Sequence, residues 1–307
     1  MEFVDIDIAV PWGQLSCRWY GNRQVRPLLA VHGLLDNLGT FARLLPLLPQ
    51  HLGVLCVDQP GHGRSSPYPD GMQYSLEDWV SVIRRVVLHF KWKRVSLMGH
   101  SLGSVVCNLY AALHPRDHVD MLIAIDMLKI RLKSNEYYIE ALVKSVERML
   151  RPPRAVQLFT AEQLQKMRWP TAPLVSEADA QDLLDRCLLP AAQESNKFYL
   201  SRDFRPSHIT VYTIEDNITL ELYKRIKKVP YLVIKADGSN FLNDENIPVI
   251  DILRANNPNF EYHLAKGSHH AHIENPEQLA AWIVPFINKY RPSSRWEDPG
   301  HTTTCKL

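Results

Sequence analysis

The segment Val95–Ser104 constrains the fold of this chain more than any other. It reads Val-Ser-Leu-Met-Gly-His-Ser-Leu-Gly-Ser and places Ser101 inside the pattern G-x-S-x-G. The residues before the pattern are apolar or small, which predicts a buried strand, and an apolar helix follows over Ser104–Leu113. A strand that turns directly into a helix needs residues without large side chains beside the bend, and the two glycines supply them. We expect the turn to hold Ser101 in a strained, exposed position at the carboxyl edge of a sheet, where a nucleophile is useful.

Short apolar runs alternate with amphipathic segments on both sides of this motif. A capping box at Ser75–Asp78 opens one predicted helix, which runs to about Phe90. This alternation indicates an α/β fold, a mostly parallel sheet covered by helices on both faces. The predicted strands are Phe3–Ala9, Leu15–Gly21, Leu28–His32, Gly53–Val57, Val95–Met98, Met121–Asp126, Tyr231–Ala236 and Glu261–Ala265.

The alternation stops over residues 129–228, where the chain is charged, helix-rich and interrupted by prolines. We interpret this segment as a helical lid (cap) over the carboxyl edge of the sheet; the alternative is a helical subdomain unrelated to the site. Long insertions in compact domains are more often functional, which favours the lid. The predicted organisation is a core in two parts, 1–128 and 229–290, with the lid between them and a polar C-terminal tail at 291–307.

Composition narrows the class of protein further. The formal charge is +2, from 35 Lys and Arg against 33 Asp and Glu, so nothing indicates nucleic acid or an acidic membrane surface as a partner. The acidic N-terminus predicts no secretory signal, and no apolar stretch reaches the length of about 18 residues that a membrane span requires. The five cysteines are scattered without C-x-x-C spacing, which favours a reducing, intracellular compartment.

A serine nucleophile needs a base to take its proton and an acid to orient that base. The run Gly267–Pro276 follows the last predicted strand and contains three histidines. We expect His269, the first of them, to be the base, and His270 and His272 to be structural. A metal site built from these three histidines is the alternative, but no Cys or carboxylate cluster accompanies them, and we predict no metal or organic cofactor.

The sequence leaves the acid open. Asp237 directly follows the predicted strand Tyr231–Ala236, so its carboxylate could reach His269 across the sheet edge. Asp126 ends an earlier strand and is equally well placed in principle, whereas Asp244 lies farther along the loop. The position at a strand end favours Asp237, with Asp126 as the alternative acid.

Acyl transfer also needs donors for the oxyanion. One is expected to be the backbone N–H of Leu102, the residue after the nucleophile, at the start of the helix. The other is expected from the loop His32–Asn37, where Gly33 permits a turn that directs the amide of Leu34 inward, with Leu35 as the alternative.

Four segments carry a combination of motifs that is informative as a set. They are His32-Gly-Leu-Leu-Asp-Asn37, Asp58-Gln-Pro-Gly-His-Gly-Arg-Ser-Ser66, Gly99-His-Ser-Leu-Gly103 and the run Gly267–Pro276. In order and spacing these segments resemble the α/β-hydrolase fold. The pairing of H-G-x-x-D-N with D-x-P-G-H-G-x-S-S resembles the serine hydrolase-like branch, which includes the kraken proteins. The resemblance covers about residues 1–128 and 229–290.

The resemblance implies Ser101 as nucleophile, His269 as base, and the amides of Leu34 and Leu102 as oxyanion donors. Typical members carry G-x-x-D after the penultimate strand, whereas this chain has Ala236-Asp-Gly-Ser239. Relatives that open epoxides or carbon–halogen bonds use aspartate as nucleophile, so a serine at position 101 favours hydrolysis of a carboxylic ester or thioester of a small-molecule acyl substrate. Carbon–carbon bond hydrolysis and a low-turnover ligand-binding or sensor protein are the alternatives.

The sequence ends in Cys305-Lys306-Leu307. This resembles the peroxisomal address S-K-L, because cysteine is close in size to serine. The expected partner is therefore the peroxisomal import receptor, and the expected location is the peroxisome, with the cytosol as the alternative. Deleting the three residues should disperse a punctate, N-terminally tagged protein.

Overall fold

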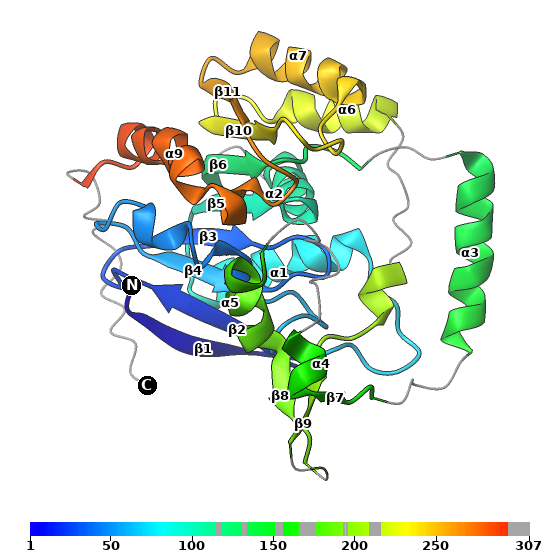
Figure 1. Ribbon diagram of the computed structural model, residues 1–307. Coiled ribbons are helices and arrows are strands. Elements are labelled where there is room, and N and C mark those ends of the chain that lie inside the picture. Colours follow the sequence, from blue (N-terminus) through cyan, green and yellow to red (C-terminus); the bar gives the residue numbers. More distant parts are fainter. Residues whose placement is uncertain are drawn as a thin grey trace.

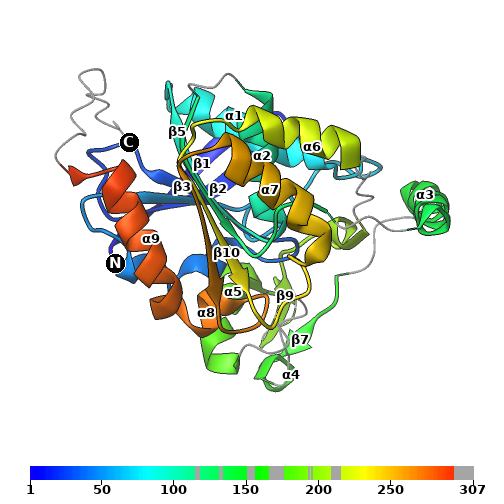
Figure 2. The same ribbon diagram turned by 90° about the horizontal axis from the view of Figure 1, so that it is seen from above.

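An eight-stranded sheet forms the centre of the protein, and helices cover both of its faces (Figures 1 and 2). The computed structural model describes residues 1–114, 118–130, 134–150, 156–165, 176–192, 194, 196–208 and 216–293. The strand order is β1-β2-β4-β3-β5-β6-β10-β11, and only the pairs β1–β2 and β2–β4 are antiparallel. The predicted α/β fold is therefore confirmed. The strands are β1 (Phe3–Val10), β2 (Gly13–Tyr20), β3 (Leu28–Val31), β4 (Val54–Val57), β5 (Val95–His100), β6 (Val119–Ile125), β10 (Tyr231–Ala236) and β11 (Phe260–Ala265).

The central strands are apolar at nearly every position because both of their faces are buried. Alternate residues of β3 illustrate this: Leu29 and Val31 pack on one side of the sheet, and Leu28 and Ala30 on the other. The first side is covered by α1 (Leu76–His89), α2 (Leu102–Leu113), α6 (Asp216–Arg225) and α7 (Ile247–Asn256). The second is covered by η1 (Leu38–Phe41), η2 (Leu45–Leu47), α8 (Ala271–Glu274) and α9 (Pro276–Tyr290).

The helix α1 begins where its sequence predicts. Ser75 Oγ accepts the amide of Asp78, and Asp78 Oδ2 accepts the amide of Ser75, so both halves of the predicted capping box are present. Within the described residues, none of the helices has the length and apolar character that crossing a bilayer demands. The four described cysteines are buried free thiols.

The segment 129–228 combines helices with a small sheet that the sequence did not predict. Its strands are two to four residues long and only partly buried, so they lack the apolar run from which a strand is recognised. Figure 1 places α3 at the periphery of the molecule, whereas α5 lies close to the centre. The elements are α3 (Asn135–Met149), β7 (Phe159–Thr160), α4 (Ala161–Gln165), α5 (Glu177–Cys187), β8 (Leu188–Pro190), β9 (Lys197–Leu200), η3 (Arg205–His208) and α6, and the sheet order is β7-β9-β8.

Several sequence predictions concern residues that the structure does not describe. These include parts of the segment 129–228, for which we predict a lid, and most of the tail, residues 294–307. The signal Cys305-Lys306-Leu307 lies outside the described residues, and the peroxisomal location stays a prediction.

Candidate active site

Ser101 occupies the turn between β5 and α2, with φ 53° and ψ −127°. Such a backbone conformation is strained for a residue with a side chain and persists only where its surroundings enforce it. The two flanking glycines explain how the turn fits. A Cβ on Gly99 would lie 2.4 Å from the backbone nitrogen of Ser104, and one on Gly103 would lie 2.2 Å from the carbonyl oxygen of Val31. The turn therefore has the strained form that the pattern predicts.

Ser101 is less accessible than expected. Its exposed fraction is 8%, because Met127 and His269 lie against it, with Met127 Sδ 3.9 Å from Ser101 Oγ. The serine is thus held in a largely enclosed position rather than on an open edge. A closed site of this kind excludes water from a reacting centre.

Three side chains form a continuous hydrogen-bonded line that begins at this serine. Ser101 Oγ lies 2.7 Å from His269 Nε2, and His269 Nδ1 lies 2.7 Å from Asp126 Oδ2. Because an ionised carboxylate can only accept, Nδ1 carries the proton and Nε2 presents its lone pair to the serine. The second carboxylate oxygen, Asp126 Oδ1, accepts the amide of Ala236 at 2.8 Å, which fixes the carboxylate between β10 and His269.

The carboxylate at His269 therefore belongs to Asp126 and not to Asp237, the residue favoured by the sequence. Asp237 is exposed, and its Oδ1 accepts the amide of Gly267 at 3.0 Å. Sheet order explains the difference, since β6 is the direct neighbour of β5 and β10 lies one strand farther from the serine. Asp126 also adopts φ 56°, in the left-handed region, so the chain turns immediately after β6. Asp244 begins η4 (Asp244–Asn246) and is exposed.

The loop that carries His269 is held from several sides. His100 Nε2 donates to the carbonyl oxygen of His269 at 2.9 Å, and Ser268 bonds Glu274 through both its amide and its hydroxyl. The Phe241 ring stacks on the His269 ring with centroids 4.0 Å apart. Sequence reasoning missed these supports. His100 is the variable residue inside G-x-S-x-G, which is the signal that could have pointed to it.

Leu34 and Leu102, the predicted oxyanion donors, lie on the two segments that flank the serine. Leu102 is the first residue of α2, where an amide has no partner within the helix. Leu34 follows Gly33, and a Cβ on Gly33 would lie 3.0 Å from Ser101 Cβ, so this loop passes close to the nucleophile. The alternative amide, that of Leu35, donates to His62 Nε2 at 3.2 Å and is thus already engaged.

Two buried histidines brace this loop in their neutral form. His32 Nδ1 donates to the carbonyl oxygen of Gly33 at 2.7 Å, and its Nε2 accepts the amide of Gln59 at 3.0 Å. His62 Nδ1 donates to the carbonyl oxygen of Pro60 at 3.0 Å, while its Nε2 accepts from Leu35. Burial lowers the pKa of both rings. Each ring thus has one donor and one acceptor satisfied, as a neutral imidazole requires.

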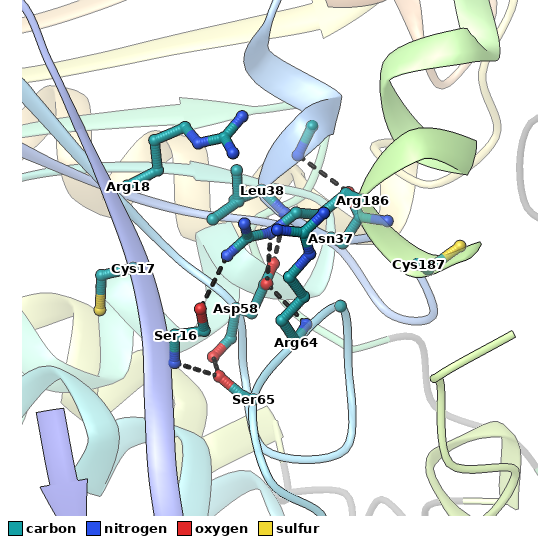
Figure 3. A network of polar contacts seen from close by, with 12 residues as sticks. Ser16, Cys17, Arg18, Asn37, Leu38, Asp58, Arg64, Ser65, Arg186 and Cys187 are labelled. Atoms are coloured by element: carbon teal, nitrogen blue, oxygen red, sulfur yellow. Dashed lines mark hydrogen bonds and ion pairs between the residues drawn. The ribbon is translucent and has the colours of Figure 1, made fainter. Parts of the chain in front are cut away.

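A buried ion pair joins α5, in the segment 129–228, to the end of β4 (Figure 3). Asp58 Oδ1 accepts the amide of Leu38 at 2.8 Å, and Asp58 Oδ2 accepts from the amide of Arg64 and from Arg186 Nε, both at 2.9 Å. Arg186 Nη2 also donates to Ser16 Oγ at 2.9 Å. Both partners of the pair are almost completely buried, so its integrity depends on α5 staying in place.

The same helix also contacts the loop before η1. Asn37 Nδ2 donates to the carbonyl oxygen of Leu183 at 2.8 Å. A Cβ on Gly39 would lie 2.4 Å from the carbonyl oxygen of Asp182, so the backbones of η1 and α5 approach as closely as they can. These contacts tie α5 to the loop that carries Leu34.

The three histidines of the Gly267–Pro276 run do not share one site. His269 faces Ser101 and Asp126, and His270 Nε2 lies 3.3 Å from Asp36 Oδ2. His272 Nε2 lies 2.8 Å from Thr40 Oγ1. The alternative of a metal site built from these three side chains is therefore not supported.

Comparison with known proteins places the chain in a family. The model of the family described as "alpha/beta hydrolase fold" matches residues 26–276. A protein of Drosophila melanogaster named "Probable serine hydrolase" is 32% identical over 295 residues, covering 93% of this chain and 88% of that protein. "Serine hydrolase-like protein 2" of Homo sapiens is 30% identical over 297 residues, covering 92% and 93%.

Solved structures show the same fold. A thioesterase domain from the curacin biosynthetic pathway superposes with a TM-score of 0.76 at 22% identity, covering 92% of this chain and 99% of that one. E-2-(acetamidomethylene)succinate hydrolase superposes with a TM-score of 0.71 at 20% identity, covering 94% and 100%. With its fold, its strained serine turn and these relatives, the chain belongs to the α/β-hydrolase family and is similar in sequence to serine hydrolase-like members of it.

Proposed function

We propose that the protein is a serine hydrolase that cleaves a carboxylic ester or thioester through an acyl-enzyme intermediate on Ser101. The observation that carries the proposal is the line Ser101–His269–Asp126, whose two contacts are both 2.7 Å long. This is the arrangement of nucleophile, base and orienting acid that activates a serine hydroxyl.

The first half of the reaction forms the acyl-enzyme. His269 Nε2 takes the proton of Ser101 as Oγ attacks the acyl carbon, and Asp126 stabilises the resulting imidazolium. The amides of Leu34 and Leu102 are proposed to hold the oxyanion of the tetrahedral intermediate. When the intermediate collapses, the imidazolium returns its proton to the leaving alcohol or thiol.

The second half releases the acid. A water molecule gives a proton to His269 Nε2 and attacks the acyl carbon, and the second intermediate breaks its bond to Ser101 Oγ, which takes the proton back. The names of the solved neighbours, a thioesterase domain and a hydrolase, support this class of reaction. The second candidate is a ligand-binding protein with little turnover, and the contact of Asp126 with His269 argues against it, because a carboxylate that orients the base is present.

A fluorophosphonate probe tests the proposal directly. Purified wild-type protein should be labelled, and Ser101→Ala and His269→Ala should abolish labelling. Asp126→Asn should slow labelling by about 10³–10⁴-fold, whereas the matched control Asp237→Asn should react at nearly the wild-type rate.

Folded wild-type protein that does not react with the probe would contradict the proposal and favour the binding protein. Labelled protein that hydrolyses neither acyl esters nor thioesters, but cleaves carbon–carbon bonds of diketones, would contradict the proposed substrate class. Ser101 would remain the nucleophile in that case.

A further inference from the structure

We propose that Asp36, His100 and His270 form a binding site for one divalent transition-metal ion, with Zn²⁺ as the best match. The proposed catalytic cycle uses none of these three side chains. They come from three separate segments, namely the loop after β3, the end of β5 and the loop after β11. All three are buried.

The spacing of the three ligand atoms fits a metal ion. Asp36 Oδ2 lies 3.3 Å from His270 Nε2 and 3.5 Å from His100 Nδ1. All three atoms lie within 4.8 Å of one another. Tetrahedral zinc binds imidazole nitrogen and carboxylate oxygen at about 2.1 Å, which separates neighbouring ligand atoms by roughly 3.4 Å. The two separations from Asp36 Oδ2 therefore match those between neighbouring ligands of one tetrahedral zinc ion.

The protonation of His100 gives the second, independent observation. His100 Nε2 lies 2.9 Å from the carbonyl oxygen of His269, so this nitrogen carries a proton. In a neutral imidazole the other nitrogen, Nδ1, then presents a lone pair, and this nitrogen is buried without a hydrogen-bond partner. It faces the carboxylate of Asp36. His32 and His62 differ, because the second nitrogen of each accepts a backbone amide.

A cation between His100 Nδ1 and Asp36 Oδ2 would resolve this contact between two electron-rich atoms. A proton is the simplest such cation, but a charge-assisted hydrogen bond closes to about 2.7–2.9 Å. The His269–Asp126 pair reaches 2.7 Å in this structure, whereas the His100–Asp36 pair remains at 3.5 Å. The longer separation suits two ligands that share a larger ion. Full burial of the ring also disfavours an imidazolium there.

The surroundings of the site match those of metal-bound histidines. Such histidines almost always donate their second ring nitrogen to a carboxylate, a backbone carbonyl or water, as His100 does to His269. Two imidazoles and a carboxylate favour zinc over calcium or magnesium, and they leave a fourth position for water. A bound ion would fasten together the three segments that carry Leu34, Ser101 and His269.

The experiment measures metal content and metal spectra on the full-length protein. Wild-type protein produced in zinc-supplemented medium and washed with chelator should retain roughly one zinc ion per chain. The variants His270→Asn and Asp36→Asn should retain under about a tenth of that amount, while the control His89→Asn, an exposed histidine at the end of α1, should match wild type. Circular dichroism checks that each variant is folded.

Because the site is buried, protein unfolded in chelator should also be refolded with Co²⁺. Wild type should show the visible absorption bands of tetrahedral Co²⁺ and a higher Tm than protein refolded without metal, and His270→Asn should show neither. Folded wild type that holds no metal by either route would overturn the proposal, as would equal metal in His270→Asn. A ¹⁵N spectrum showing both nitrogens of His100 protonated would overturn the proposal as well, because a proton would then lie between His100 Nδ1 and Asp36 Oδ2 in place of a metal ion. Fluorophosphonate labelling of Ser101 is read separately, so failure of the metal site and failure of the proposed function are distinguishable.

Discussion

The carboxyl edge of the sheet has an inner part and an outer part that behave differently. The inner part, at the ends of β3, β4, β5 and β6, presents His32, Asp58, His100 and Asp126, all of them buried. The outer part, at the ends of β10 and β11, presents the exposed residues Asp237 and Lys266. Both parts place polar residues directly after parallel strands, which is where ligands bind in open α/β sheets. The polar residues of both parts therefore share their position at a strand end. They differ in burial, because those of the inner part are buried and those of the outer part are exposed.

Burial decides what a carboxylate at this edge can do. Asp126 is held by Ala236 on one oxygen and faces His269 with the other, so its orientation is set before any substrate arrives. Asp237 shares its side chain between water and the amide of Gly267. A preorganised carboxylate in a closed site stabilises a developing charge far better than a solvated one.

The sharpest test of this contrast compares two aspartate variants. Asp126→Asn should lower kcat for a chromogenic acyl ester by about 10⁴-fold, because the amide no longer holds His269 in the right tautomer. Asp237→Asn should change kcat by no more than about twofold, since substitutions on the surface rarely exceed ~0.5 kcal/mol. Equal losses in the two variants would show that both parts of the edge serve the same reaction.

Two ion pairs of equal length that differ in burial allow the effect of burial on the free energy of unfolding to be compared. Arg186 Nε lies 2.9 Å from Asp58 at the inner edge, and Lys289 Nζ lies 2.9 Å from Glu261 on β11. Arg186→Met should lower the free energy of unfolding by about 3–5 kcal/mol, because it leaves a buried carboxylate without its counter-charge. Lys289→Met should cost less than about 1 kcal/mol, because water screens that pair. Urea unfolding measures both, and a small effect of Arg186→Met would mean that the inner edge tolerates an unpaired charge.

A smaller effect concerns the response of the inner edge to acid. Burial lowers the pKa of His32 and His62, whose rings lie 5.1 Å apart, and Arg202 lowers the pKa of His62 further, whereas Asp36 raises it. Below pH 6.5 the unfolded chain binds protons that the folded protein does not, so stability falls as the pH falls. Each histidine contributes a slope of at most about 1.4 kcal/mol per pH unit.

The variant His62→Gln isolates one of these contributions. Its stability should fall less steeply than that of wild type between pH 7 and pH 5.5, whatever its stability at pH 8. Chemical unfolding at several pH values gives the two slopes. Parallel slopes would show that His62 is protonated in the folded protein, contrary to the contacts of its ring.

Much of the fold was predictable because its signals are local. The apolar runs of β3, β4, β5 and β10, the capping box of α1 and the turn at Ser101 each depend on residues close together in the sequence. The small sheet β7-β9-β8 was not predictable, because its strands are short and partly exposed and their pairing joins separate parts of the segment 129–228.

The acid was harder to predict than the base for a physical reason. His269 is marked by its own loop, between the last strand and the last long helix. Choosing between Asp126 and Asp237 requires the order of strands in the sheet and the left-handed φ of Asp126, and neither leaves a periodic signal in the sequence. The grouping of Asp36, His100 and His270 joins segments more than 60 residues apart, so only the folded structure reveals it.

The attachment of α5 bears on how far this part of the molecule can move. Swinging this helix outward would strip Asp58 of its guanidinium partner and release Asn37 from Leu183, beside the loop that carries Leu34. A helix that completes a buried ion pair cannot move without leaving a buried charge unpaired. These contacts therefore fix α5 against the central sheet, and any movement of the segment 129–228 that preserves the Arg186–Asp58 pair has to leave this helix in place.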